Sequence, residues 1–137
     1  MEFLIQKELT NKILKSYYKV YNTLGFGFLE KVYENALMIE LYKNGIKAIK
    51  QKPIKVFYEN QIVGEYFADI IVEESIILEL KAVEHLIKED ENQLINYLKS
   101  TNIEIGLLLN FGKEPEIRRK FFSNERKKLN LDNSKSV

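Results

Sequence analysis

The residues best suited to chemistry are two carboxylates and a lysine on consecutive stretches of predicted strand. Glu79 and Lys81 are two positions apart in an apolar run, so their side chains point the same way while Leu80 points into the core. Asp69 precedes a turn expected at 73–75, and an antiparallel hairpin that turns there can set Asp69 beside Glu79. The spacing therefore predicts two acids and a base at one point of a sheet.

This group has the parts of metal-assisted phosphodiester hydrolysis. Two adjacent carboxylates repel, and each raises the pKa of the other unless a cation lies between them. Mg²⁺ prefers carboxylate oxygens and keeps several waters. A lysine beside the ion can position or deprotonate a water, or offset the charge that builds on a phosphate. An ordinary ion pair at the edge of a sheet is the alternative that these three residues leave open.

Two further features accompany this group. Glu30 stands near the start of a predicted helix, where an acid is also favourable simply because of the helix dipole. Gln93 and Tyr97 are four positions apart on another predicted helix and share a face. The alternative for this pair is a polar surface residue beside a half-buried tyrosine.

Composition excludes several classes of site. The 137 residues, 45% of them hydrophobic and 30% charged, indicate one folded domain. We expect it to span residues 1–130, with a frayed tail over 131–137. Cysteine is absent, which excludes disulfides, thiolate zinc sites and iron–sulfur clusters. A single histidine, His85, excludes a multi-histidine zinc site and is expected to be a polar loop residue or a helix cap.

Charge is balanced overall but uneven along the chain. The formal net charge is +1, yet residues 113–137 hold eight basic against four acidic residues and all three arginines, including Arg118 and Arg119. We expect these two arginines to contact phosphates, with a solvated terminal helix as the alternative. The first residues lack the apolar stretch of a signal peptide, and the apolar runs are too short to cross a bilayer, so we expect a cytoplasmic protein without membrane contact.

The elements that must position these residues follow from the apolar periodicity, which predicts an α/β domain. Helices are predicted over the first two dozen residues, over 29–43 with a stop at Gly45, over 89–99, and over 115–124, where Ile117 and Phe121 would pack. Strands are predicted over 46–51, 54–59, 62–72, 76–81 and 103–110, the last of them buried on both faces.

Taken in order, the segments Gly27–Tyr33, Ala68-Asp69, Glu79–Val83, Gln93–Leu98 and Gly106–Gly112 closely resemble the GxxExxY family of the PD-(D/E)XK nuclease-like superfamily, over about residues 8–122. The resemblance implies a restriction-endonuclease-like core, with a mixed four- to five-stranded sheet flanked by helices. Ala68 departs from the proline of the superfamily name, a position that shapes the backbone and supplies no ligand.

The resemblance also implies roles for individual residues. Asp69 and Glu79, with the Leu80 carbonyl, would bind Mg²⁺ (or Mn²⁺), and Glu30 would complete the metal site or the layer around it. Lys81 would orient or activate the attacking water. Gln93 and Tyr97 would help to hold the lysine or the substrate, DNA in preference to RNA. We therefore predict a Mg²⁺-dependent nuclease. A catalytically silent nucleic-acid- or protein-binding domain on the same fold is the first alternative, and a subunit that assembles with itself or a protein partner is the second.

Overall fold

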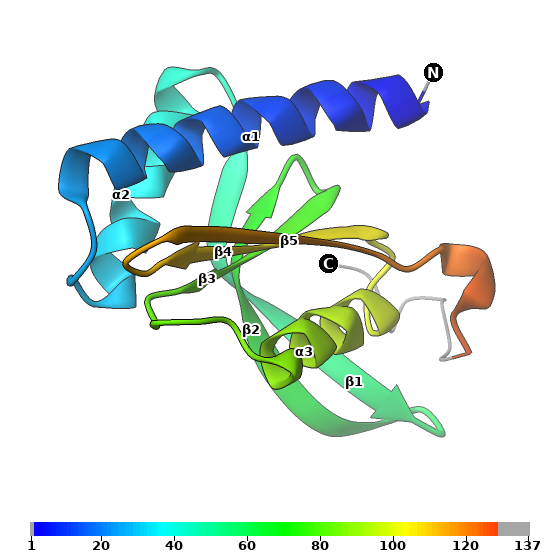
Figure 1. Cartoon of the computed structure of the whole chain (residues 1–137). Coiled ribbons are helices and arrows are strands. Elements are labelled where there is room, and N and C mark those ends of the chain that lie inside the picture. The colour runs from blue at the N-terminus through cyan, green and yellow to red at the C-terminus, as the bar shows by residue number, and fades with distance from the viewer. Residues whose placement is uncertain (1, 129–137) are drawn as a thin grey trace.

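The computed structural model describes residues 2–128, which form a sheet with helices packed around it (Figure 1). The predicted tail at 131–137 lies outside the described residues. The elements in chain order are α1 (Glu2–Leu24), α2 (Glu30–Lys43), β1 (Ala48–Tyr58), β2 (Gln61–Val72), β3 (Ile76–Lys81), α3 (Lys88–Lys99), β4 (Ile105–Phe111), β5 (Pro115–Phe121) and the short 3₁₀ helix η1 (Asn124–Arg126). None of the helices in this part of the chain is long and apolar enough to cross a membrane.

The five strands form one mixed sheet in the order β1–β2–β3–β4–β5, which confirms the predicted α/β architecture. Neighbouring strands are antiparallel except β3 and β4, which run parallel with α3 as the crossover between them. A parallel pair needs such a crossover, usually a helix, because the chain must return to the same end of the sheet. The helices over 29–43 and 89–99 and the strands over 62–72, 76–81 and 103–110 are confirmed to within two residues at each end.

The helices cover both faces of the sheet, with α1 and α2 on one side and α3 on the other (Figure 1). On the first side, Ile13 of α1 and Leu37 of α2 belong to the same buried cluster as Leu78 of β3. On the second side, Leu94 of α3 packs in a cluster with Ile77 of β3. The central strands are thus buried on both faces, which explains their continuous apolar runs.

The prediction of two separate strands around Pro53 is wrong, because β1 runs through this proline as a single strand. Proline cannot donate a hydrogen bond to a neighbouring strand, so within sheets it is confined to edge strands and strand ends. β1 is the edge strand of the sheet, and Pro53 stands opposite Phe67 of β2. The missing N–H therefore costs the sheet little at this position.

The predicted helix over 115–124 is also wrong. Residues Pro115–Phe121 form β5, which pairs antiparallel with β4 from Ile105 to Phe111. The four-residue spacing of Ile117 and Phe121 suits a helix, but only Ile117 packs against the core, and Phe121 is 60% exposed. Phe122 packs against the opposite cluster instead. Without β5, one edge of the buried strand β4 would have no partner. The energy of pairing β5 with β4 therefore overrides the local helical pattern.

Gly106 allows α3 to approach β4 closely. A Cβ added at this glycine would lie 2.7 Å from Leu94 Cδ1, inside the normal contact distance. Leu94 is fully buried, so it has little room to move away.

We predict that Gly106→Ala destabilises the protein by about 1–3 kcal/mol, the usual cost of overpacking a core. Gly64→Ala is the matched control, because a Cβ at Gly64 would make only ordinary contacts, the nearest at 3.5 Å. Urea denaturation followed by circular dichroism measures both. Equal stability of the two variants would contradict the close packing of α3 on β4.

Candidate active site

The ladder between β2 and β3 stops at the two predicted acids. The strands pair from Val72↔Ile76 to Ile70↔Leu78, and one position further the side chains of Asp69 and Glu79 replace the backbone partners. The Asp69 N–H donates to Glu79 Oε1 at 3.0 Å, and the Leu80 N–H donates to Asp69 Oδ2 at 2.8 Å. The predicted proximity of these carboxylates is therefore present, and each carboxylate is fixed by the backbone of the opposite strand.

Aromatic packing positions the start of α2 and, with it, the acidic residues of that helix. Tyr33 is fully buried and stacks on Phe111 of β4 with the ring centroids 4.2 Å apart. Its hydroxyl donates to the Gly25 carbonyl at 2.6 Å and accepts from the Phe28 N–H at 3.2 Å. Gly25 and Gly27 both have positive φ, a conformation that glycine adopts readily. One tyrosine thus fixes the loop that precedes Glu30.

Sequence reasoning missed Glu34, one helical turn after Glu30. Glu34 is only 4% exposed, and its Oε2 accepts a hydrogen bond from Gln51 Nε2 of β1 at 2.6 Å. The same amide nitrogen lies 3.3 Å from Asp69 Oδ1. The four-residue spacing of the two glutamates on one helix face was the available signal. Nothing in the local sequence marked Gln51.

These side chains border one small cleft of about 150 Å³. It is lined by Glu30, Lys31, Glu34, Gln51, Asp69 and Leu80. The cleft thus brings together residues of four consecutive elements, α2, β1, β2 and β3.

Burial and mutual repulsion raise the pKa values of the acids here. Glu79 is 8% exposed, and burial first and the Asp69 charge second raise its pKa to about 8. Burial is also the largest cause of the raised pKa of Asp69 and of Glu30. The Lys81 ammonium acts in the opposite direction and lowers the pKa of all three acids. The site therefore disfavours the ionised form of all three acids, and Lys81 offsets this effect only in part.

Lys81 forms an ion pair with α3, and the loop that follows Lys81 is anchored to β4. Its Nζ lies 3.6 Å from Asp90 Oδ1, a partner in the first turn of α3 that sequence reasoning missed. The loop that follows Lys81 is tied to β4 by the buried side chain of Asn110, which accepts from the Val83 N–H at 3.0 Å and donates to the Val83 carbonyl at 2.9 Å. His85 is exposed in this loop, as predicted.

Gln93 and Tyr97 form the expected pair on α3. Gln93 Nε2 donates to the Tyr97 hydroxyl at 2.8 Å, and the Tyr97 ring lies 5.6 Å from that of Tyr66 on β2. Burial first and the Glu79 charge second raise the pKa of Tyr97 to about 12. The electrostatic influence of Glu79 connects this pair to the acids.

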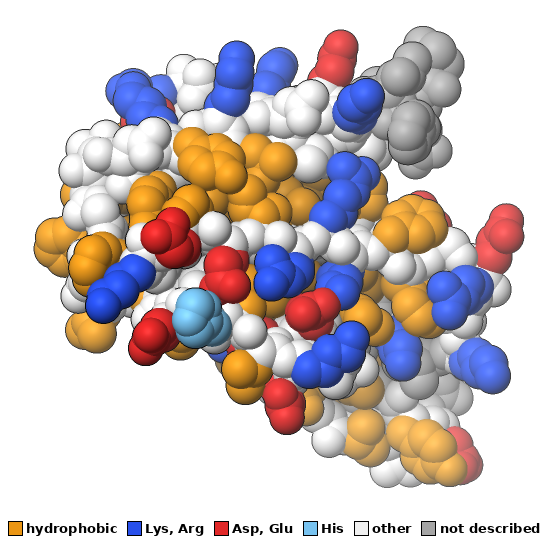
Figure 2. Space-filling model, viewed as in Figure 1, with side chains coloured by type: hydrophobic (Ala, Val, Ile, Leu, Met, Phe, Trp, Pro, Cys, Tyr) orange, Lys and Arg blue, Asp and Glu red, His pale blue; other side chains and the backbone are white. Residues whose placement is uncertain are grey.

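Arg118 and Arg119 are placed on a strand and not on a helix, so they project from opposite faces of β5. Arg118 lies 3.8 Å from a carboxylate oxygen of Glu91 on α3 and 3.7 Å from one of Glu116. Arg119 borders a separate hollow with Phe121. The surface nearby mixes both signs of charge, and acidic side chains flank the histidine in Figure 2.

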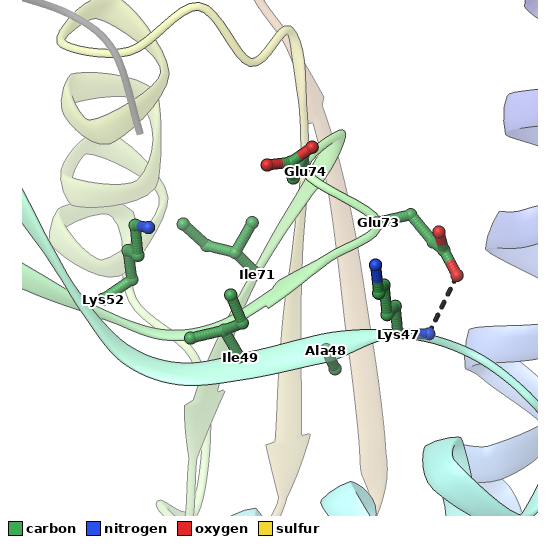
Figure 3. Close-up of a pocket in the computed structure, with 7 residues that line it drawn as sticks. All are labelled: Lys47, Ala48, Ile49, Lys52, Ile71, Glu73 and Glu74. Atoms are coloured by element: carbon green, nitrogen blue, oxygen red, sulfur yellow. Dashed lines mark hydrogen bonds between the residues drawn. The ribbon is translucent and has the colours of Figure 1, made fainter.

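Larger hollows lie away from the acids. The one in Figure 3, of about 430 Å³, is bounded by strand residues Ile49 and Ile71 and by charged side chains at Lys47, Lys52, Glu73 and Glu74. Glu73 is engaged there, because its Oε2 accepts the Lys47 N–H at 2.8 Å. This hollow contains none of the residues that surround Asp69 and Glu79.

The donor types at the cleft fit a hard divalent cation, although no three His, Cys, Asp or Glu side chains within residues 2–128 converge closely enough to hold one as they stand. Carboxylate oxygens are the ligands that Mg²⁺ prefers. A buried carboxylate beside a second one, as at Glu79 and Asp69, is stabilised by added positive charge.

The sheet order, the interrupted ladder and the acid–lysine group define a class of α/β protein built around an acidic site between two separating strands. A family model of the PD-(D/E)XK nuclease superfamily matches residues 7–120, and the chain belongs to this superfamily. The five-stranded mixed sheet flanked by three helices agrees with the restriction-endonuclease-like fold predicted from the sequence. No curated protein and no solved structure matches the chain.

The raised pKa of Glu79 predicts how stability depends on pH without metal. Between the ordinary pKa of a glutamate and about 8, the folded protein keeps the proton that the unfolded chain has lost. Stability should therefore fall as pH rises from 5 to 8, by at most about 1.4 kcal/mol per pH unit for this one group. Urea denaturation in EDTA at several pH values measures the slope. Glu79→Gln should reduce it, and an equally steep slope in that variant would assign the effect to other groups.

Proposed function

We propose that the protein is a Mg²⁺-dependent nuclease that hydrolyses phosphodiester bonds in DNA. The observation that carries the proposal is the reciprocal bonding of Asp69 and Glu79 where β2 and β3 separate, with Lys81 two residues further along β3. Membership of a nuclease superfamily supports it. A protein that served only to bind would have no use for two clustered carboxylates with raised pKa values.

Asp69, Glu79 and the Leu80 carbonyl would hold the ion, and Glu30 would complete the site from α2. The Leu80 N–H points to Asp69, and because the N–H and C=O of a strand residue face the same neighbour, we expect its carbonyl on that side too. When bound, the ion would polarise the phosphate and lower the pKa of an attacking water. Mn²⁺ has similar ligand preferences and would substitute.

Lys81 would orient the attacking water or stabilise negative charge on the phosphate. Its side chain is 32% exposed, and its Nζ lies 3.6 Å from Asp90, so the side chain is accessible to substrate and restrained in orientation. A fixed positive charge stabilises a transition state without having to reorganise during the reaction.

The substrate contacts are proposed at Gln93, Tyr97, Arg118 and Arg119. The charges of Glu79 and Asp69 act on Tyr97, and the two arginines lie on opposite faces of β5, which is an edge strand. DNA that passes along this edge can meet side chains from both faces of β5.

We also propose that the protein acts in the cytoplasm.

We predict that Lys81→Met lowers DNA turnover by about a hundredfold or more, because a group that acts in the transition state is lost. Methionine keeps much of the lysine volume, so a packing defect is avoided. Affinity for the same DNA in Ca²⁺ should change little. The assay compares wild type and variant on linear, nicked, branched and single-stranded DNA, and on RNA, with Mg²⁺ or Mn²⁺.

Equal cleavage by wild type and Lys81→Met would overturn the assignment of the site. Binding without cleavage of any of these substrates by wild type would favour the silent binding domain. Cleavage of RNA alone would correct the substrate and keep the site.

A second prediction concerns the two arginines. Each phosphate contact on duplex DNA contributes about −0.9 to the slope of log affinity against log salt. Arg118→Ala and Arg119→Ala should each flatten that slope by about 0.9, and the double variant by about twice as much. Lys15→Ala, an exposed position on α1, is the matched control. Titrations in Ca²⁺ at several salt concentrations measure the slopes, and unaltered slopes would remove β5 from the DNA interface.

A further inference from the structure

The side-chain amide of Gln51 lies between two carboxylates from different elements. Gln51 Nε2 donates to Glu34 Oε2 of α2 at 2.6 Å and lies 3.3 Å from Asp69 Oδ1 of β2. An amide nitrogen carries two hydrogens, so it can serve both acceptors at once. Gln51 is therefore the direct link between the acid of the second helix and the acid of the sheet.

The backbone at Gln51 is unusual for a residue with a long side chain. Its φ is 56°, in the left-handed region, although it lies inside strand β1. Glycine adopts this conformation readily and asparagine tolerates it better than most residues. Residues kept in such a conformation concentrate at functional sites, where the surrounding structure tolerates the strain. Here the retained side chain is the one that reaches both carboxylates.

A neutral donor suits this position better than a charged one. Lys50 and Lys52 flank Gln51, and Lys50 Nζ donates to Asn35 Oδ1 on the outer part of α2. A lysine between Glu34 and Asp69 would cancel the negative charge that a cation needs. Glu34 already has one cationic partner, since Lys31 Nζ lies 3.4 Å from its Oε1. The amide of Gln51 orients both carboxylates without adding a second cation.

Asp69 is consequently held at both oxygens. The Leu80 N–H occupies one position on Oδ2, and Gln51 occupies one on Oδ1. Each carboxylate oxygen accepts more than one bond, so both oxygens keep capacity for a metal ion. The orientation of the carboxylate is set before any ion binds.

We propose that Gln51 is a positioning residue of the metal site, whose amide ties Asp69 to Glu34 and fixes the Asp69 carboxylate for the ion. The proposal rests on the metal-dependent function proposed above. Partners that orient metal ligands typically contribute 10- to 100-fold to metal affinity. Loss of the Gln51 amide should therefore weaken metal binding while the protein stays folded.

The test is Mn²⁺ binding to the full chain without nucleic acid, measured by isothermal titration calorimetry at 15 °C. Gln51→Gly removes the amide in a residue type suited to φ 56°. Gln51→Asn keeps an amide and tolerates the backbone, but is one methylene too short to link both acids. We expect both variants to bind Mn²⁺ about 10- to 100-fold more weakly than wild type. Circular dichroism confirms that each is folded at this temperature.

Glu74→Gly is the matched control. Glu74 has φ 55° and is exposed in the turn between β2 and β3, so the substitution makes the same backbone change away from the acids. Its Mn²⁺ affinity should equal that of wild type. Gln51 variants with altered melting temperature but wild-type Mn²⁺ affinity would overturn the proposal and assign Gln51 to the fold alone. Absence of Mn²⁺ binding by wild type would overturn the metal-dependent function together with this proposal.

Discussion

The exchange of hydrogen bonds between Asp69 and the β3 strand is the constraint on which the rest of the site depends. Two antiparallel strands normally satisfy each other's backbone groups, and here two carboxylates perform that task where the ladder ends. A buried backbone N–H without a partner is costly, so the carboxylates are fixed by the same requirement that stabilises the sheet. The chemistry-bearing groups are thus structural partners as well, and neither strand can shift without moving both acids.

The surrounding elements support the two strands and restrain the orientation of their carboxylates. β3 stays paired with β4 as far as Lys81↔Asn110, so the strand that leaves β2 is still supported on its other side. Asn110 anchors the loop after Lys81, and Tyr33 anchors the loop that leads into α2. The acidic side chains gather between these supports, with Lys81, Lys31 and neutral donors around them. The fold keeps the acids ordered and leaves their charges only partly compensated.

The sequence alone predicted the features that depend on local pattern. Strand periodicity placed Asp69, Glu79 and Lys81 together, and the family resemblance supplied the fold class. Glu34 was missed although its four-residue spacing from Glu30 was a signal. Gln51 was missed because its role arises from contacts of β1 with α2 and β2, which no local spacing encodes. β5 was mistaken for a helix because the pattern of Ile117 and Phe121 suits either element, and only the open edge of β4 decides between them. Tertiary pairing outweighed local propensity at that position.

The order of strands in the sheet, which repeats their order in the chain, has a consequence for how the molecule assembles. Three of the four strand pairs close through short turns, whereas β3 and β4 meet only after α3 has been laid down between them. Closing a longer loop costs more entropy, and non-local pairing is slow to form. The folding rate should therefore be limited by the parallel pairing of β3. The early β2–β3 hairpin would then bring Asp69, Glu79 and Lys81 together before β4 arrives with Asn110, which anchors the loop after Lys81.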